Sequence, residues 1–117
     1  MIALSIETKL KKINEDNFVF SGSTVLAALG CRAPQDFDVI HVGDVAPHPN
    51  LSSHNSQLRF LRYKKNELIF NPKNYFYYMG FKFLKPSIIL ELKSNRYKIK
   101  PKAKDLEDIQ ILEEFRD

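Results

Sequence analysis

A chain of 117 residues is long enough for one ordinary domain and too short for two, so we expect a single domain over residues 1–117. Hydrophobic residues make up 44% of the chain and charged residues 27%, which is typical of soluble globular proteins and argues against disordered or fibrous classes. The 18 Lys and Arg residues exceed the 14 Asp and Glu residues, and the formal charge of +4 suits either a polyanionic partner or a plain solvated basic face.

Membrane, secreted and thiolate-metal classes are also disfavoured by the sequence. No segment approaches the roughly 18 apolar residues of a membrane span, and residues 1–17 lack the successive basic, apolar and small-residue regions of a signal peptide. Cys31 is the only cysteine, so neither an intramolecular disulfide nor a thiolate metal cage can form. We therefore expect a cytoplasmic protein without a membrane span.

The first half of the chain alternates helical and extended patterns. Apolar residues at helical spacing predict a first helix, and a hydroxyl residue and a glycine delimit a second one. In chain order we expect a helix over about residues 2–15, a buried strand "FVFSG" (18–22), a helix "STVLAALG" (23–30), a turn "RAPQ" (32–35) and an alternating strand "DFDVIHV" (36–42).

The second half begins with a polar segment, residues 43–56, which predicts a long exposed loop. Next we expect two strands, 57–63 and 67–70, that pair through the intervening "KKN", whereas 71–86 is ambiguous between strand and helix. Two helices close the chain: "PSIILELKSN" (86–95), with proline in its first turn, and the amphipathic "KAKDLEDIQILEEF" (102–115). The predicted fold class is α+β, with a mixed β-sheet and flanking helices.

Asp36 and Asp38 interrupt a hydrophobic strand and project from the same face, with Cβ atoms roughly 6–7 Å apart. Two like charges this close are unfavourable unless a cation or a basic side chain lies between them. Mg²⁺ takes carboxylate oxygens and commonly completes its shell with water and substrate phosphates. The pair therefore predicts either half of a Mg²⁺ site or an exposed strand end beside a lysine or arginine.

The Gly-Ser step before the second helix strengthens the metal hypothesis. A strand that ends in "SGST" and opens a helix presents backbone N–H groups, the hydroxyls of Ser23 and Thr24 and the positive end of the helix dipole at one point. Gly22 permits a close approach to the backbone. This combination favours the binding of a phosphate group. A tight turn with a hydroxyl cap is the simpler alternative explanation of "GST".

The stretch "FVFSGSTVLAALGCRAPQDFDVI" resembles the signature of the nucleotidyltransferase superfamily, which has the polymerase-beta-like fold. The resemblance implies that Gly22 and Ser23 hold a triphosphate, while Asp36 and Asp38 bind the metal that bridges it to the attacking hydroxyl. Arg32 resembles a basic position of small members.

A second resemblance covers the end of the chain. "YYMGFKFLKPSIILELKSNR" followed by "KAKDLEDIQIL" is similar to the closing segment of minimal nucleotidyltransferase-like proteins, including ones associated with bacterial surface-polysaccharide genes. The two resemblances together span about residues 18–115.

One feature departs from the family pattern. Active members place a third carboxylate on a later strand, where it helps to deprotonate the acceptor hydroxyl. "SQLRFLRYKK" contains no acid, and Glu67 is the nearest candidate, although it is equally a hairpin-end residue. The aromatic residues of "YFYYMGFKF" beside Lys82 and Lys85 would either stack a base or pack in the core.

Our functional hypothesis is a Mg²⁺-dependent protein that transfers a nucleoside monophosphate from an NTP to a hydroxyl or phosphate acceptor. Gly22, Ser23 and Thr24 would hold the outer phosphates, with Arg32 or Lys82 offsetting the remaining charge. Two alternatives stay open: an inactive module that binds a nucleotide, a nucleotide sugar or a protein partner, and a basic nucleic-acid-binding domain. A homodimer or a larger partner would complete the acceptor site of so small a protein.

Overall fold

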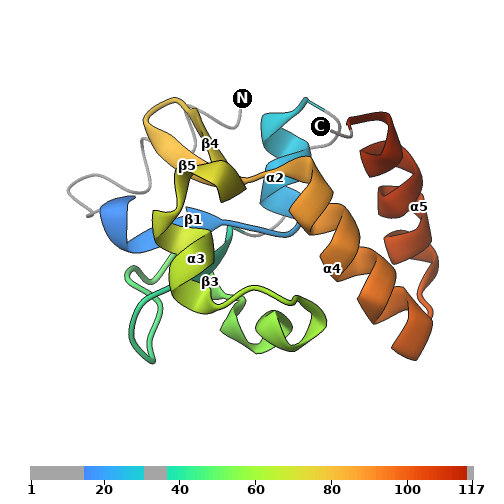
Figure 1. The fold of residues 1–117 in the computed structure, drawn as a ribbon, viewed down its shortest axis with the longest axis horizontal. Coiled ribbons are helices and arrows are strands. Elements are labelled where there is room, and N and C mark those ends of the chain that lie inside the picture. Colours follow the sequence, from blue (N-terminus) through green and yellow to red (C-terminus); the bar gives the residue numbers. More distant parts are fainter. Residues whose placement is uncertain (1–14, 31–36, 116–117) are drawn as a thin grey trace.

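The computed structural model describes residues 15–30 and 37–115 (Figure 1). Its helices and strands, in chain order, are β1 (Phe18–Phe20), α2 (Ser23–Ala28), β2 (Asp38–His41), β3 (Ser52–Ser53), α3 (Lys65–Phe70), β4 (Tyr75–Tyr78), β5 (Phe81–Leu84), α4 (Pro86–Ile99) and α5 (Ala103–Leu112). Short 3₁₀ turns lie between them: η1 (Glu15–Asn17), η2 (Asn55–Phe60), η3 (Pro72–Asn74) and η4 (Glu113–Phe115).

The strands form one mixed sheet in the order β3-β2-β1-β5-β4. β1 pairs antiparallel with β2 and parallel with β5, while β3 lies parallel to β2 and β4 closes a hairpin with β5. Helices flank this sheet, so the predicted α+β class with a mixed sheet is confirmed.

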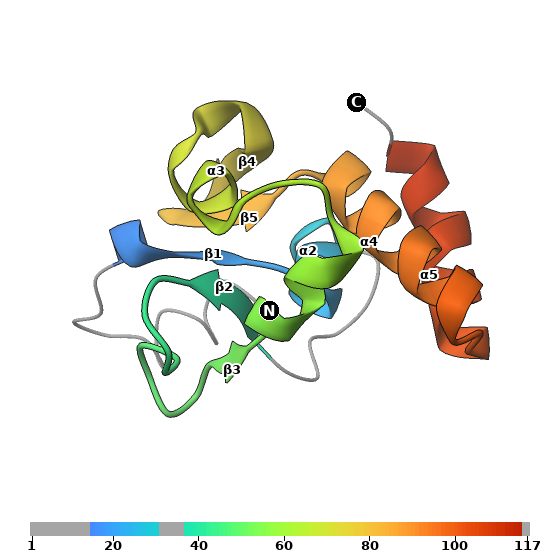
Figure 2. The same ribbon diagram turned by 60° about the horizontal axis from the view of Figure 1, so that its bottom comes forward.

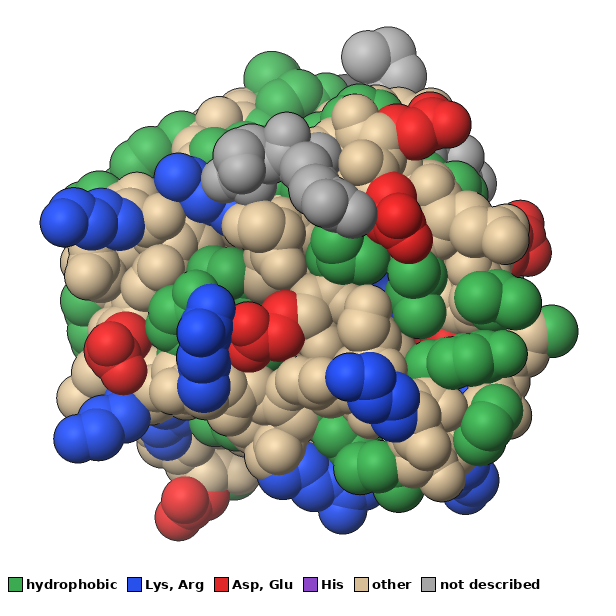
Figure 3. All heavy atoms as spheres, turned by 45° about the vertical axis from the view of Figure 1, so that its right-hand side comes forward, with side chains coloured by type: hydrophobic (Ala, Val, Ile, Leu, Met, Phe, Trp, Pro, Cys, Tyr) green, Lys and Arg blue, Asp and Glu red, His purple; other side chains and the backbone are tan. Residues whose placement is uncertain are grey.

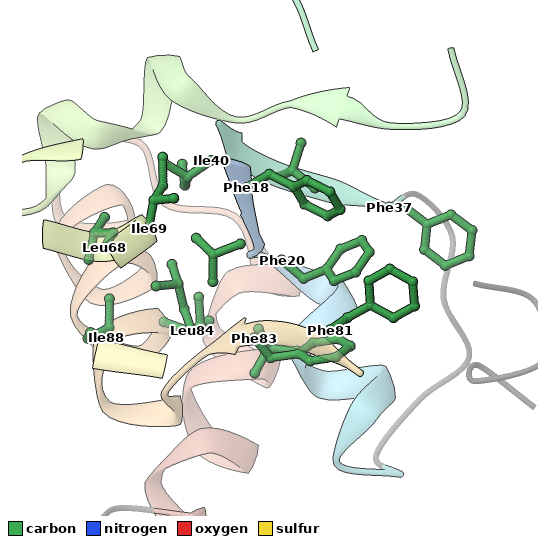
Figure 4. Close-up of a cluster of buried hydrophobic side chains, with 14 of the residues drawn as sticks. Phe18, Phe20, Phe37, Ile40, Leu68, Ile69, Phe81, Phe83, Leu84 and Ile88 are labelled. Carbon is green, nitrogen blue, oxygen red and sulfur yellow. The ribbon is translucent and has the colours of Figure 1, made fainter. Parts of the chain in front are cut away.

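Alternation along the strands gives the sheet two different faces. The rings of Phe18, Phe20 and Phe83 share one face, and the Phe20 and Phe83 centroids lie 4.9 Å apart. Val19 and Ile40 point the other way and are fully buried on the side of α3, which supplies Leu68 and Ile69 to the core (Figure 4). The sheet therefore lies at the centre of the fold, with buried side chains on both of its faces.

α4 and α5 lie side by side at one end of the molecule (Figures 1 and 2). A cluster of buried charges joins them. Lys93 Nζ of α4 lies 3.1 Å from Asp108 Oδ2 of α5, and Arg96 binds both carboxylate oxygens of Asp105, at 2.9 and 2.6 Å. Both carboxylates therefore pair with cations of the neighbouring helix.

Both closing helices were predicted, and Pro86 lies in the first turn of α4 as expected. The strand "FVFSG", the helix after it and the strand containing Asp38 are also confirmed, while the segment 71–86 resolves into the β4–β5 hairpin. The expected helix over residues 2–15 lies outside the described residues, apart from Glu15 in η1.

The prediction of two strands over residues 57–63 and 67–70 was wrong. The first segment begins inside the 3₁₀ turn η2, and the second belongs to α3. Glu67 explains the second error, because its side chain accepts a hydrogen bond of 2.8 Å from the Lys64 N–H and so caps the start of α3. The loop expected over 43–56 also holds a short edge strand, β3.

We expect the free energy of unfolding to fall by about 3 kcal/mol in Lys93→Met, because this change removes the cation that lies 3.1 Å from the buried carboxylate of Asp108. The double variant Lys93→Met/Asp108→Leu replaces the whole pair with apolar side chains and should recover much of that loss. Urea unfolding of the wild type, both single variants and the double variant measures the difference. A double variant as unstable as the sum of the two single variants would contradict this expectation.

Candidate functional site

Asp38 begins β2 where β1 has just ended, and two hydrogen bonds fix its backbone there. The Ser21 N–H donates to the Asp38 carbonyl oxygen at 2.8 Å, and the Asp38 N–H donates to Thr24 Oγ1 at 3.1 Å. Thr24 is fully buried, so its hydroxyl anchors β2 and the side chain does not line the cavity described below. The predicted phosphate-binding role of Thr24 is therefore replaced by a structural one.

Gly22 lies directly against the Asp38 side chain. Its φ of +61° is unfavourable for any residue with a Cβ atom. A Cβ at this position would lie 2.8 Å from Asp38 Oδ2 and 3.1 Å from His54 Cε1. The expected close approach to the Gly22 backbone thus occurs within the protein itself, to a carboxylate and an imidazole.

A cavity of about 430 Å³ opens beside this turn. Gly22, Ser23, Asp38 and His54 line it together with residues of η2, α4 and α5. Basic side chains outnumber carboxylates on its walls, the basic ones being Arg59, Lys93, Arg96, Lys100, Lys102 and Lys104 and the acidic ones Asp38, Asp105 and Asp108. The excess positive charge favours an anionic ligand.

The most deeply buried basic side chains of the cavity, Lys93 and Arg96, already pair with carboxylates. Burial raises the pKa of Asp105, but the hydrogen bonds and charge of Arg96, together with Lys93, outweigh this effect and hold the pKa below its usual value. Burial likewise lowers the pKa of Lys93, although Asp108 opposes that shift. The excess positive charge therefore comes from the exposed residues of the rim, including Arg59, Lys100 and Lys102.

The outer face of the α4–α5 pair carries no single basic patch. Figure 3 faces this side of the molecule and shows Lys and Arg side chains at separate positions, with carboxylates between some of them and hydrophobic side chains along one edge.

Lys82 does not lie in the cavity, contrary to the predicted nucleotide-binding role. Its side chain is buried, and Nζ donates hydrogen bonds to the carbonyl oxygens of Asp16 at 3.0 Å and Ile69 at 2.5 Å. The ammonium also lies over the rings of Phe70 and Tyr75, and burial lowers its pKa. Lys82 therefore joins α3 and η1 to the sheet.

Glu67 also lies away from the cavity, since it is exposed and caps α3. It is not placed to act as the third carboxylate beside Asp38. Arg32 and Asp36 fall outside the described residues, so the predicted Asp36–Asp38 pair and the role of Arg32 remain predictions. Of the predicted site residues, the structure brings Gly22, Ser23 and Asp38 together.

Several lining residues were not found from the sequence. His54 follows β3, and its Nε2 lies 3.7 Å from Asp38 Oδ2. Arg59 comes from η2, and Lys93 and Arg96 come from α4. Two helix faces could have been recognised from the sequence, because residues three apart share a helix face. One face carries the basic residues Lys93 and Arg96 of α4, and the other carries the acidic residues Asp105 and Asp108 of α5.

The donor groups at this point fit a divalent cation in part. Asp38 supplies a carboxylate oxygen of the kind that Mg²⁺ prefers, in a space that a Cβ on Gly22 would fill. Within residues 15–30 and 37–115, no cluster of three or more His, Cys, Asp or Glu side chains is arranged to hold a metal. Any cation bound here would complete its shell with ligand oxygens, with water or with Asp36.

Comparisons of the chain with family models, curated proteins and solved structures gave no match. Among the helices that the structure describes, none has the length and apolar character needed to cross a membrane.

Gly22→Ala should destabilise the protein more than Gly30→Ala. Both glycines have positive φ, so each substitution should cost about 1–3 kcal/mol of backbone strain. Only at Gly22 does the added methyl group also collide with Asp38 and His54, whereas no atom of residues 15–30 and 37–115 lies within 4 Å of a Cβ at Gly30. Thermal or urea unfolding of the two variants checks this difference, and equal losses would show that the contact with Asp38 is easily relieved.

Proposed function

We propose that the protein is nucleotidyltransferase-like and binds an NTP together with Mg²⁺ in the cavity between β2 and the α4–α5 pair. The proposal rests mainly on one observation: the Gly22-Ser23 turn and Asp38 line the same cavity as an excess of basic side chains. The cavity of about 430 Å³ is within the size range of small-ligand sites. The resemblance of residues 18–40 to the nucleotidyltransferase signature supports the same proposal.

Each part of the cavity has a role in this proposal. The rim cations Arg59, Lys100 and Lys102 attract the phosphates, and Ser23 of the Gly22-Ser23 turn, which lines the cavity, holds the outer phosphates. Asp38, with Asp36, would hold Mg²⁺, which neutralises charge on the phosphates and orients them. The reaction is transfer of a nucleoside monophosphate to a hydroxyl or phosphate acceptor, with a second copy or a larger partner completing the acceptor site.

Asp38→Asn should weaken NTP binding in the presence of Mg²⁺ by about tenfold or more. The substitution keeps the size of the side chain but removes its charge, and a contact to a charged group contributes about 1.5–3 kcal/mol. Calorimetric titration with each of the four NTPs plus Mg²⁺ measures the change.

Glu67→Gln is the matched control for this titration, because it removes one carboxylate of the same chain far from the cavity. It should bind like the wild type. Absence of binding in the wild type with every NTP would refute the proposed function.

A nucleotide-binding module without transfer activity is the second candidate, and one observation favours it. β3 lies beside β2, and the residue that follows β3 and faces Asp38 is His54 rather than a carboxylate. Glu67, the other candidate for a third acid, lies elsewhere. Binding and transfer must therefore be measured separately.

Pyrophosphate release in the presence of sugar, sugar-phosphate and protein hydroxyl acceptors distinguishes the two candidates. For a transferase we expect release that requires an acceptor and Mg²⁺, that is lost in Asp38→Asn and that is unchanged in Glu67→Gln. Tight NTP binding with no release for any acceptor class would support the binding module instead. A fall in turnover in Glu67→Gln would show that Glu67 reaches the reacting groups after all.

A further inference from the structure

His54 is held against Asp38 by the sheet. Its backbone N–H donates to the Val39 carbonyl oxygen at 2.8 Å, which extends the pairing of β3 with β2 by one residue. The ring then points at Asp38, with Nε2 3.7 Å from Oδ2, and both side chains are mostly buried, at 21% and 14% exposure. Both residues line the cavity.

This separation is close to that of two ligands on one metal ion. Metal–ligand bonds of about 2.1 Å at octahedral or tetrahedral angles place neighbouring donor atoms about 3.0–3.5 Å apart. The observed 3.7 Å needs only a small rotation of either side chain to reach that range. A carboxylate alone suits Mg²⁺, whereas an added imidazole shifts preference toward transition metals.

We propose that Asp38 and His54 together bind a divalent transition metal ion, and that His54 makes the site prefer Mn²⁺ to Mg²⁺. NTP phosphates and water complete the coordination shell. This inference rests on the proposed function, because it concerns the cation that accompanies the nucleotide in the same cavity. It changes the expected ligand set from carboxylates alone to a carboxylate and an imidazole.

The test is Mn²⁺ binding followed by the loss of the electron paramagnetic resonance signal of free Mn²⁺, with a nonhydrolysable ATP analogue present and protein-free analogue subtracted. In the wild type, bound Mn²⁺ should resist displacement by about a tenfold excess of Mg²⁺. His54→Ala should weaken Mn²⁺ binding by about tenfold or more, since even the loss of a group that only supports a ligand costs about 10–100-fold.

Two further variants sharpen the result. His54→Asp supplies an oxygen ligand at the same place and should let Mg²⁺ compete about tenfold better than in the wild type. His48→Ala is the matched control, because His48 accepts a hydrogen bond from the Asn50 N–H within the loop and does not line the cavity. It should bind Mn²⁺ like the wild type.

The outcomes separate this inference from the proposed function. Failure of every NTP to bind, with either cation, would overturn both. NTP binding that is equally strong with Mg²⁺ and Mn²⁺ would overturn the inference alone, and this comparison needs only the wild type. Unchanged Mn²⁺ binding in a folded His54→Ala would also overturn it, and would leave His54 as a simple ion-pair partner of Asp38.

Discussion

The hydrogen bonds between the end of β1 and the start of β2 are the constraint on which the rest of the site depends. The Ser21 N–H and the Thr24 hydroxyl hold the Asp38 backbone from both sides, so the side chain leaves β2 directly over Gly22. The next pairing along the sheet, from His54 N–H to Val39 O, brings the imidazole to the same point. Backbone pairing and the Thr24 hydroxyl therefore place both groups without any ligand.

A cluster of buried charges joins α5 to α4, whereas α4 itself packs against the core through Ile88 and Ile89. Leu112 is the one fully buried apolar side chain described in α5, whereas Asp105 and Asp108 are buried against Lys93 and Arg96 of α4. Buried ion pairs contribute little net stability because desolvation offsets their attraction, but they favour one relative orientation of the two helices. We interpret this charge cluster as the contact that orients α5 on α4 and so places Lys100, Lys102 and Lys104 at the cavity.

Local signals made about half of this structure predictable. Pro86 and the hydroxyl residues after Gly22 mark helix starts, and the aromatic alternation of β1 marks a strand, because each depends on the chain's immediate neighbours. The run "ELIF" is too short to reveal a helical or extended period, and its conformation is decided by the cap at Glu67. Lys82 escaped prediction because its acceptors, the carbonyls of Asp16 and Ile69, come from distant segments.

The site residues were also predictable only where they lie close together in the sequence. The sequence pattern located Gly22, Ser23 and Asp38, but only the tertiary structure places Arg59 and His54 around the same cavity. With a carboxylate at one end and excess positive charge elsewhere, a free polyphosphate would meet repulsion at Asp38. A metal–phosphate complex presents opposite charges at its two ends, and this is why we propose a nucleotide that carries its cation rather than phosphate alone.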